Sequence, residues 1–186
     1  MQGTKFSVHI FRIFLNDLKP EIWRRVAVPS FFTLHDLHQV IQAAMPWTNA
    51  HCHLFTVGKA RFAPVGPETG AGVQDESKAY LHQLFPAVRA TAEYVYDLGD
   101  DWRHGIFVED ISVAKKDIQY PACLGGERAC PPEDCGGPDG FLEYLESTRA
   151  MAHPQKQAML AWKKDFDPAL FMAEEANCRL RLVHPL

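Results

Sequence analysis

The sequence has no long apolar run. Among its 186 residues, uncharged apolar side chains nowhere continue for the roughly 20 positions that a membrane-spanning helix needs. Residues 1–8 also lack the apolar stretch that a secretory signal peptide requires. These two absences predict a cytoplasmic protein that has no membrane partner.

Positive charge is also scarce. The 19 Lys and Arg residues are outnumbered by 23 Asp and Glu residues, which gives a net charge of −4 and a pI near 6.1. Most nonspecific affinity for nucleic acid comes from basic side chains that displace counterions from phosphates. A nucleic-acid partner is therefore not expected, because the best basic cluster, centred on Arg24 and Arg25, is small.

The familiar local signatures of catalysis are missing as well. The sequence has no Gly-x-Ser-x-Gly of a hydrolase, no Gly-x-x-x-x-Gly-Lys of a phosphate-binding loop and no His-Glu-x-x-His of a metalloprotease. It also has no internal repeat and no low-complexity tract. Whether the protein is an enzyme therefore stays open at this level.

What the sequence does contain is the composition of one folded domain. Hydrophobic residues make up 47% of the chain and charged residues 23%, the balance of an ordinary globular protein. A chain of this length can bury most of its apolar surface in a single core. We therefore expect residues 1–186 to form one domain.

Alternating apolar side chains rich in β-branched and aromatic residues predict most of the secondary structure. The predicted strands cover residues 5–15, 21–28, 51–57, 59–62, 91–98 and 103–113. A helix is predicted over residues 34–45, because Thr33 and Asp36 resemble a capping pair and Pro46 ends the pattern. Residues 64–74 are predicted to form a loop, and further helices are predicted over residues 140–148, 154–163 and 168–182. The expected fold class is α+β, with a mixed, mostly antiparallel sheet, helices packed against it and a helical C-terminal third.

His51 and His53 are the first candidates for metal binding. Two histidines separated by one residue in a strand point to the same face and can both reach one ion. The alternative is that both rings make ordinary hydrogen bonds on a face of the sheet. Five other histidines are expected to be solvated or capping residues: His35, His38, His82, His153 and His184.

The predicted hairpin turn at residues 96–104 is the second candidate. It gathers three carboxylates, an imidazole, a guanidinium and an indole, on Asp97, Asp100, Asp101, His104, Arg103 and Trp102. Residues that flank a tight turn lie within side-chain reach, so Asp97 and His104 are candidates for an acid/base pair or a ligand pair. In the alternative, Asp100 and Asp101 bond the amides of their own turn and Trp102 packs inward.

A cysteine-rich segment at residues 121–138 is the third candidate. Thiolates are favoured zinc ligands, and three cysteines fall within thirteen residues: Cys123, Cys130 and Cys135. Their spacings of six and four intervening residues lack the two-residue knuckle of a zinc ribbon. The odd total of five cysteines is typical of free thiols or metal ligands in a reducing compartment. The alternative is an ordered structural loop.

Together the three segments predict one zinc site and one recognition groove, provided that the fold brings them to the same place. The predicted zinc ligands are His51, His53, His104, Cys123, Cys130 and Cys135. The predicted recognition residues are aromatic, basic or acidic, and the first two kinds are the usual anchors of recognition surfaces. They are Trp23, Arg24, Arg25, Trp47, Asp97, Asp100, Asp101, Trp102, Arg103, Glu133 and Asp134.

Five segments, taken in order, resemble a known family. Residues 20–25, 34–48, 51–55, 96–104 and 123–141 are similar to the plasmid pRiA4b ORF-3-like family, and the resemblance runs over roughly residues 6–171. It implies a compact α+β fold with a mixed sheet. The family is largely uncharacterised, and some members are labelled as resolvase-like passengers of insertion elements. No serine of this chain has the flanking arginines of a recombinase nucleophile.

Three functions follow as hypotheses. The leading one is a noncatalytic intracellular binding or regulatory domain of a mobile-element-associated family, whose partner is an unknown protein or small ligand. The second is a zinc-dependent hydrolase, in which the metal activates a water and Asp97 or Asp100 is the base. The third, an accessory factor in DNA transposition or recombination, is implied by the family resemblance alone.

Overall fold

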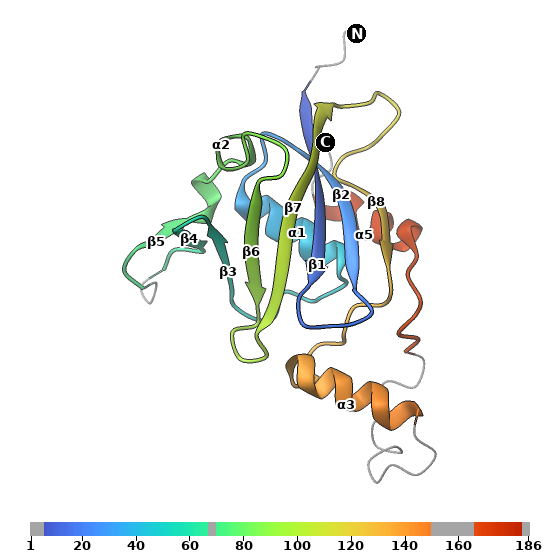
Figure 1. The fold of residues 1–186 in the computed structure, drawn as a ribbon. Helices are drawn as coiled ribbons and strands as arrows, with labels where there is room; N and C mark the ends of the chain where they lie inside the picture. The colour runs from blue at the N-terminus through green and yellow to red at the C-terminus, as the bar shows by residue number, and fades with distance from the viewer. Residues whose placement is uncertain (1–5, 67–69, 150–165, 184–186) are drawn as a thin grey trace.

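Eight strands form one continuous sheet in the computed structural model, which describes residues 6–66, 70–149 and 166–183 (Figure 1). They are β1 (Ser7–Leu15), β2 (Trp23–Pro29), β3 (His53–Val57), β4 (Ala60–Ala63), β5 (Val73–Asp75), β6 (Thr91–Tyr96), β7 (Trp102–Val113) and β8 (Ala122–Glu127). Their order across the sheet is β5-β4-β3-β6-β7-β1-β2-β8. Only the β4–β5 pair is parallel in this sheet, which confirms the mixed, mostly antiparallel prediction.

Three hairpins are present, including the one predicted at residues 96–104. β1 pairs with β2, β3 with β4 and β6 with β7, each antiparallel, and β1 also pairs with β7 so that the hairpins join into one sheet. Two strands were not predicted. β5 lies partly inside the expected loop of residues 64–74, and β8 lies inside the segment rich in glycine, proline and cysteine.

Helix α1 (Leu34–Ala44) begins at a capping box. The Thr33 side chain accepts from the Asp36 amide, and the Asp36 carboxylate accepts from the Thr33 amide at 2.8 Å. This reciprocal arrangement satisfies two amides of the first turn. The helix turns Leu37 and Ile41 toward the sheet and ends before Pro46, as predicted.

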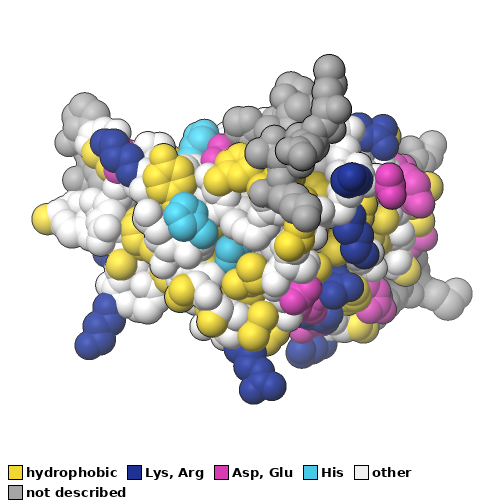
Figure 2. All heavy atoms as spheres, turned by 90° about the horizontal axis from the view of Figure 1, so that it is seen from above, with side chains coloured by type: hydrophobic (Ala, Val, Ile, Leu, Met, Phe, Trp, Pro, Cys, Tyr) yellow, Lys and Arg dark blue, Asp and Glu magenta, His cyan; other side chains and the backbone are white. Residues whose placement is uncertain are grey.

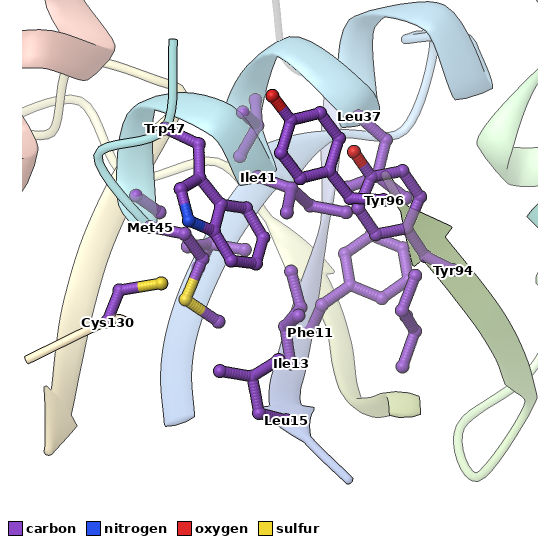
Figure 3. Packing of buried hydrophobic residues seen from close by; sticks show 14 of the residues in the cluster. Phe11, Ile13, Leu15, Leu37, Ile41, Met45, Trp47, Tyr94, Tyr96 and Cys130 are labelled. Carbon is purple, nitrogen blue, oxygen red and sulfur yellow. The ribbon is translucent and has the colours of Figure 1, made fainter. Parts of the chain in front are cut away.

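The helices α1 and α5 (Ala173–Val183) lie on the same face of the sheet, behind it in the view of Figure 1. Between α1 and the sheet lies a core in which Trp47 stacks on Tyr96 with ring centroids 4.8 Å apart (Figure 3). Trp102 is 1% exposed and belongs to the same core. These rings therefore stabilise the fold by burial and are not displayed at the surface.

The C-terminal helices agree with the sequence in part. Helix α3 (Gly137–Arg149) covers the predicted helix at residues 140–148, and α5 covers the second half of the one predicted at 168–182. The helix predicted at residues 154–163 lies outside the described residues. Two short helical turns, η1 (Glu76–Lys78) and α2 (Leu81–Leu84), were not predicted. No helix in the described part is long and apolar enough to cross a membrane.

Figure 2 shows the end of the molecule that carries α2, viewed from above. Histidine and hydrophobic side chains lie near one another on this face. Basic and acidic side chains are both spread toward its edges, so positive charge is not concentrated among the described residues seen there.

Candidate functional site

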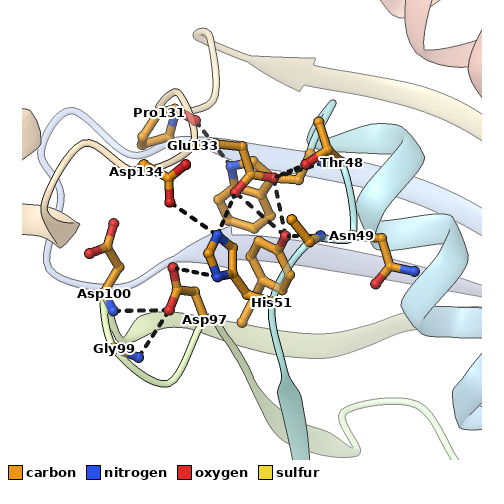
Figure 4. Close-up of polar contacts among 12 residues, drawn as sticks. Thr48, Asn49, His51, Asp97, Gly99, Asp100, Pro131, Glu133 and Asp134 are labelled. Carbon is orange, nitrogen blue, oxygen red and sulfur yellow. Dashed lines mark hydrogen bonds and ion pairs between the residues drawn. The ribbon is translucent and has the colours of Figure 1, made fainter.

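Three segments that are far apart in the sequence meet around the imidazole of His51 (Figure 4). Its Nδ1 lies 3.5 Å from an Asp97 oxygen, and its Nε2 lies 3.1 Å from an Asp134 oxygen and 3.8 Å from a Glu133 oxygen. His51 precedes β3, Asp97 follows β6, and the two other acids belong to the loop of residues 128–136 between β8 and α3. We call these four residues the acidic His51 site.

The turn between β6 and β7 fixes the carboxylate of Asp97. Its backbone is in the left-handed region, with a φ of 54°, and its amide donates to the Cys52 carbonyl at 2.9 Å. One carboxylate oxygen accepts from the amides of Gly99 at 3.0 Å and Asp100 at 3.2 Å. The other oxygen is the one that faces His51. Asp97 is therefore held by its own turn, a role that the sequence interpretation had given to Asp100 and Asp101, whose carboxylates accept from Gly136 and Arg103 instead.

Glu133 fastens the loop of residues 128–136 to the segment before β3. One carboxylate oxygen accepts from the Thr48 amide at 2.7 Å, from the Thr48 hydroxyl at 3.1 Å and from the Tyr96 hydroxyl at 3.1 Å. Burial, together with the neighbouring Glu133 carboxylate, raises the pKa of Tyr96 to about 12, which keeps its hydroxyl a donor. Glu133 therefore acts mainly as an anchor of the loop.

Two further contacts hold the same loop in place. The Trp47 indole donates to the Pro131 carbonyl at 3.1 Å, and the Gly136 amide donates to an Asp100 carboxylate oxygen at 3.2 Å. Gly137 has a φ of 70° and lies so close to Asp100 that an added Cβ would sit 2.5 Å from its carbonyl oxygen. Only glycine fits this approach without a backbone shift. The loop is thus seated on the β6–β7 turn.

The donor chemistry of the site fits a divalent cation. One ligand atom each from His51, Asp97 and Asp134 lie within 4.8 Å of one another, and no second group of three such side chains occurs among the described residues. A neutral imidazole has one N–H, so it can donate to only one of two carboxylates on opposite ring nitrogens. The second ring nitrogen would then face its carboxylate lone pair to lone pair, unless a proton or a metal ion lies between them. Imidazole and carboxylate together suit zinc or manganese.

Comparison with known proteins identifies the family. The family model described as "Plasmid pRiA4b ORF-3-like protein" matches residues 7–175. The chain belongs to this family. A relative in Sinorhizobium fredii (strain NBRC 101917 / NGR234), "Uncharacterized protein y4hQ", is 36% identical over 177 residues, which cover 92% of this chain and 89% of the relative.

A solved structure of similar fold supports the architecture. The crystal structure of a protein of unknown function, MM3350 from Methanosarcina mazei Go1, has a TM-score of 0.85 and 34% identity over 92% of this chain and 97% of that one. The pRiA4b ORF-3-like fold is therefore α+β, as expected. The descriptions of these two proteins name no activity.

In this member of the pRiA4b ORF-3-like family, the six predicted zinc ligands do not gather at one place. The His53 Nε2 donates to the Glu76 carboxylate at 2.7 Å, and its ring stacks on His38 at a centroid distance of 3.6 Å. His104 is fully buried, and its Nδ1 lies 2.9 Å from the Trp102 carbonyl. The prediction of a shared site for His51, His53 and His104 is wrong, because β3 begins only at His53 and the two neighbouring rings take different partners.

The three loop cysteines also stay apart from His51. Burial raises the pKa of the Cys123 and Cys130 thiols, and burial with the nearby Asp100 raises that of Cys135 to about 12. Protonated thiols are poor metal ligands. Cys123 lies in β8 and its thiol approaches the Gly125 carbonyl at 3.4 Å. All five cysteines are free, and the predicted cysteine ligands belong to no metal-binding group in the described structure.

Several predicted recognition residues have structural roles instead. Trp47, Trp102 and Arg24 are buried, so the prediction that they line an open groove is wrong for the two indoles. Trp23 is half-buried under the Arg12 guanidinium, 4.2 Å above its ring. Two exposed or half-buried arginines form ion pairs within the sheet, Arg25 with Glu109 and Arg103 with Asp101 at 2.8 Å. Of the predicted set, Asp97, Glu133 and Asp134 contact His51, and Asp100 supports their loop.

A groove of about 890 Å³ adjoins the site and was not predicted. His51, His53 and His38 line it together with the exposed Cys52. His38 is buried, which corrects the expectation of a solvated residue, and it bonds Tyr94 at 2.8 Å and Asn49 at 2.7 Å. One sign of its burial is visible in the sequence, because His38 falls on the same helical face as Leu34, Leu37 and Ile41.

Proposed function

We propose that the protein is a noncatalytic, cytoplasmic binding domain whose acidic His51 site holds a divalent cation. One observation carries the proposal. Both nitrogens of a single imidazole face carboxylate oxygens, from Asp97 on one side and Asp134 on the other. Among the described residues no lysine or arginine forms an ion pair with these two carboxylates or with Glu133, so the three acids have only the His51 imidazole as a partner of possible positive charge. Five free cysteines are consistent with a reducing cytoplasm.

The cation would join the loop of residues 128–136 to the rest of the domain. Asp97 is nine-tenths buried and fixed by amides, whereas the Asp134 side chain is 74% exposed. A cation bound to both would therefore restrain the exposed partner against the fixed one. Because His51 also lines the groove, occupancy of the site would set the shape of that groove's edge. In this proposal the ligand binds in the groove, and the bound cation regulates that binding through the shape of the groove's edge.

The hydrolase alternative has less support from the same geometry. It needs Asp97 or Asp100 as a base, yet one oxygen of Asp97 accepts from two amides and Asp100 accepts from the Gly136 amide. Each of these hydrogen bonds occupies a carboxylate oxygen that a catalytic base would offer to a substrate proton. The role in DNA transposition stays a prediction that a salt-dependent gel shift would test.

Replacing Asp134 is expected to weaken cation binding at least about tenfold, since even indirect ligand partners contribute this much to metal affinity. Isothermal titration calorimetry with Zn²⁺ and with Mn²⁺ should give one site per chain for the wild type. Asp134→Asn and His51→Gln should both lose affinity. Asp139→Asn is the matched control, because Asp139 is an exposed acid in the first turn of α3 and its loss removes the same charge.

The Asp139→Asn control also defines a result that would contradict the proposal. If Asp139→Asn weakens binding as much as Asp134→Asn, the cation responds to general charge and the proposed site is wrong. A wild-type protein that takes up neither ion at millimolar concentration would equally contradict the proposal.

A further inference from the structure

Two arginines line a second pocket, on the side of the sheet that the helices cover. Arg24 comes from β2 and Arg179 from α5, and the pocket between them and the end of α1 has a volume of about 330 Å³. Phe171 and Pro131 contribute apolar walls. No residue of the acidic His51 site lines this pocket, so it is a separate feature of the described structure.

Arg24 is a buried cation whose partners are all neutral. It is 2% exposed, and its guanidinium donates to the carbonyls of Ala44 at 3.0 Å, of Trp23 at 2.7 Å and of Glu127 at 3.1 Å. The guanidinium carbon lies 4.1 Å above the ring of Phe171. These hydrogen bonds use Nε and one terminal nitrogen. The second terminal nitrogen makes none of them, so its N–H groups can donate to a ligand.

Arg179 brings a second positive charge to the same place. Its Nε donates to the Ala43 carbonyl at 2.8 Å, which leaves both terminal nitrogens for another partner. Arg24 and Arg179 thus both bond carbonyls in the last turn of α1, which has no basic residue of its own there. The end of a helix offsets only about half a unit charge, so most of the two positive charges is left uncompensated.

Among the described residues, no carboxylate forms an ion pair with either arginine. Asp167 and Glu175 also line the pocket, but neither is paired with Arg24 or Arg179. The Cys123 and Cys130 thiols are close to Arg24, but burial raises the pKa of both and keeps them neutral. A buried charge without a counterion is costly, and proteins retain one mainly where a ligand or partner supplies the opposite charge.

We propose that the Arg24–Arg179 pocket binds the oxyanion group of a small ligand, a phosphate or carboxylate attached to a small apolar body. The planar guanidinium matches either group with paired hydrogen bonds. Phe171, Leu170 and Met45 among the lining residues provide the apolar surface that such a body would contact. The volume lies at the lower end of the range of small-molecule pockets, which excludes a dinucleotide or a polymer as the bound group.

Calorimetric titration with phenyl phosphate and, separately, with benzoate tests the proposal at fixed ionic strength. Saturable binding of at least one of them at one site per chain is expected, and comparing the two distinguishes the phosphate from the carboxylate source. Arg179→Gln should weaken the binding about tenfold or more, the usual effect of losing a hydrogen bond to a charged group. Arg181→Gln is the matched control, since Arg181 is exposed on the same helix and carries the same charge.

A second measurement on the wild-type protein avoids reliance on a variant that fails to fold. The Nε–H signals of Arg24 and Arg179 in an NMR spectrum should shift as phenyl phosphate or benzoate saturates the site. Equal weakening by Arg179→Gln and Arg181→Gln would overturn the proposal, as would saturation without a shift of either Nε–H signal. Absence of saturable binding by both compounds would overturn it as well.

Discussion

Acidification from pH 6.5 to pH 4 is expected to destabilise the protein by several kcal/mol, because His38, His104 and, to a lesser extent, His9 are buried and burial lowers the pKa of each. Burial, aided for His38 by the neighbouring His53, lowers the pKa of His38 and of His104 from 6.5 to about 4. In the unfolded chain both rings take up a proton near pH 6.5. In the folded chain they resist protonation until about pH 4. The unfolded state therefore binds more protons throughout this interval, and stability falls as the pH falls.

The magnitude follows from the size of the two pKa shifts. Each contributes roughly 3 kcal/mol when the pH has dropped below the folded value. Glu76 adds to the loss at lower pH. Burial is the largest single influence and opposes its ionisation, but the hydrogen bonds from His53 and His35 and the neighbouring histidine charges together outweigh burial and lower the pKa of Glu76. Urea unfolding at a series of pH values from 7 to 4 measures the whole effect as a fall in the free energy of unfolding.

Replacing His104 by phenylalanine measures how much this residue contributes to the fall in the free energy of unfolding at low pH. The variant should lose about half of the pH dependence between pH 6.5 and pH 4, whatever its stability at pH 7. Ile106→Val is the control, because Ile106 is 1% exposed and its substitution costs about 1 kcal/mol at every pH. An unchanged pH dependence in His104→Phe would contradict a neutral buried imidazole.

Trp102→Ala is expected to cost about 3–5 kcal/mol of folding stability, the usual loss for a large buried aromatic side chain. The ring is 1% exposed and packs near Trp47, with centroids 6.1 Å apart. Trp23→Ala provides the comparison. That ring is half-buried beneath Arg12, so we expect a cost of about 1–2 kcal/mol.

Urea unfolding of the two variants checks this difference. The sequence alone made both tryptophans candidates for a recognition surface, and that role would leave folding intact in Trp102→Ala. A Trp102→Ala variant as stable as the wild type would therefore contradict the core position described above.

The sheet and the first helix were predictable because local patterns specify them. Residues 7–15 and 102–113 alternate in burial, and the capping box at Thr33 and Asp36 defines the start of α1. β8 was not predictable in this way. Its residues include two glycines and one cysteine, and they form a strand because β2 offers them hydrogen bonds, with Val26 opposite Cys123. Tertiary pairing, not propensity, makes this strand.

The candidate site was predictable in its parts but not in its assembly. His51, Asp97, Glu133 and Asp134 all belong to the predicted metal or recognition residues, yet only the fold brings them together. One error was avoidable. Trp102, His104 and Ile106 share one face of β7, so the alternation that places the tryptophan in the core also places His104 there. Glu76, the partner of His53, belongs to no local pattern and could not be found from the sequence.

A crystal of the protein grown with Mn²⁺ or Zn²⁺ and measured at an anomalous wavelength tests the central proposal most directly. The account predicts one strong anomalous peak bonded to His51, Asp97 and Asp134, with zinc–ligand distances of about 2.0–2.2 Å. A peak on the cysteines or on the pair of His53 and Glu76 would contradict it, and so would a map with no peak beside His51.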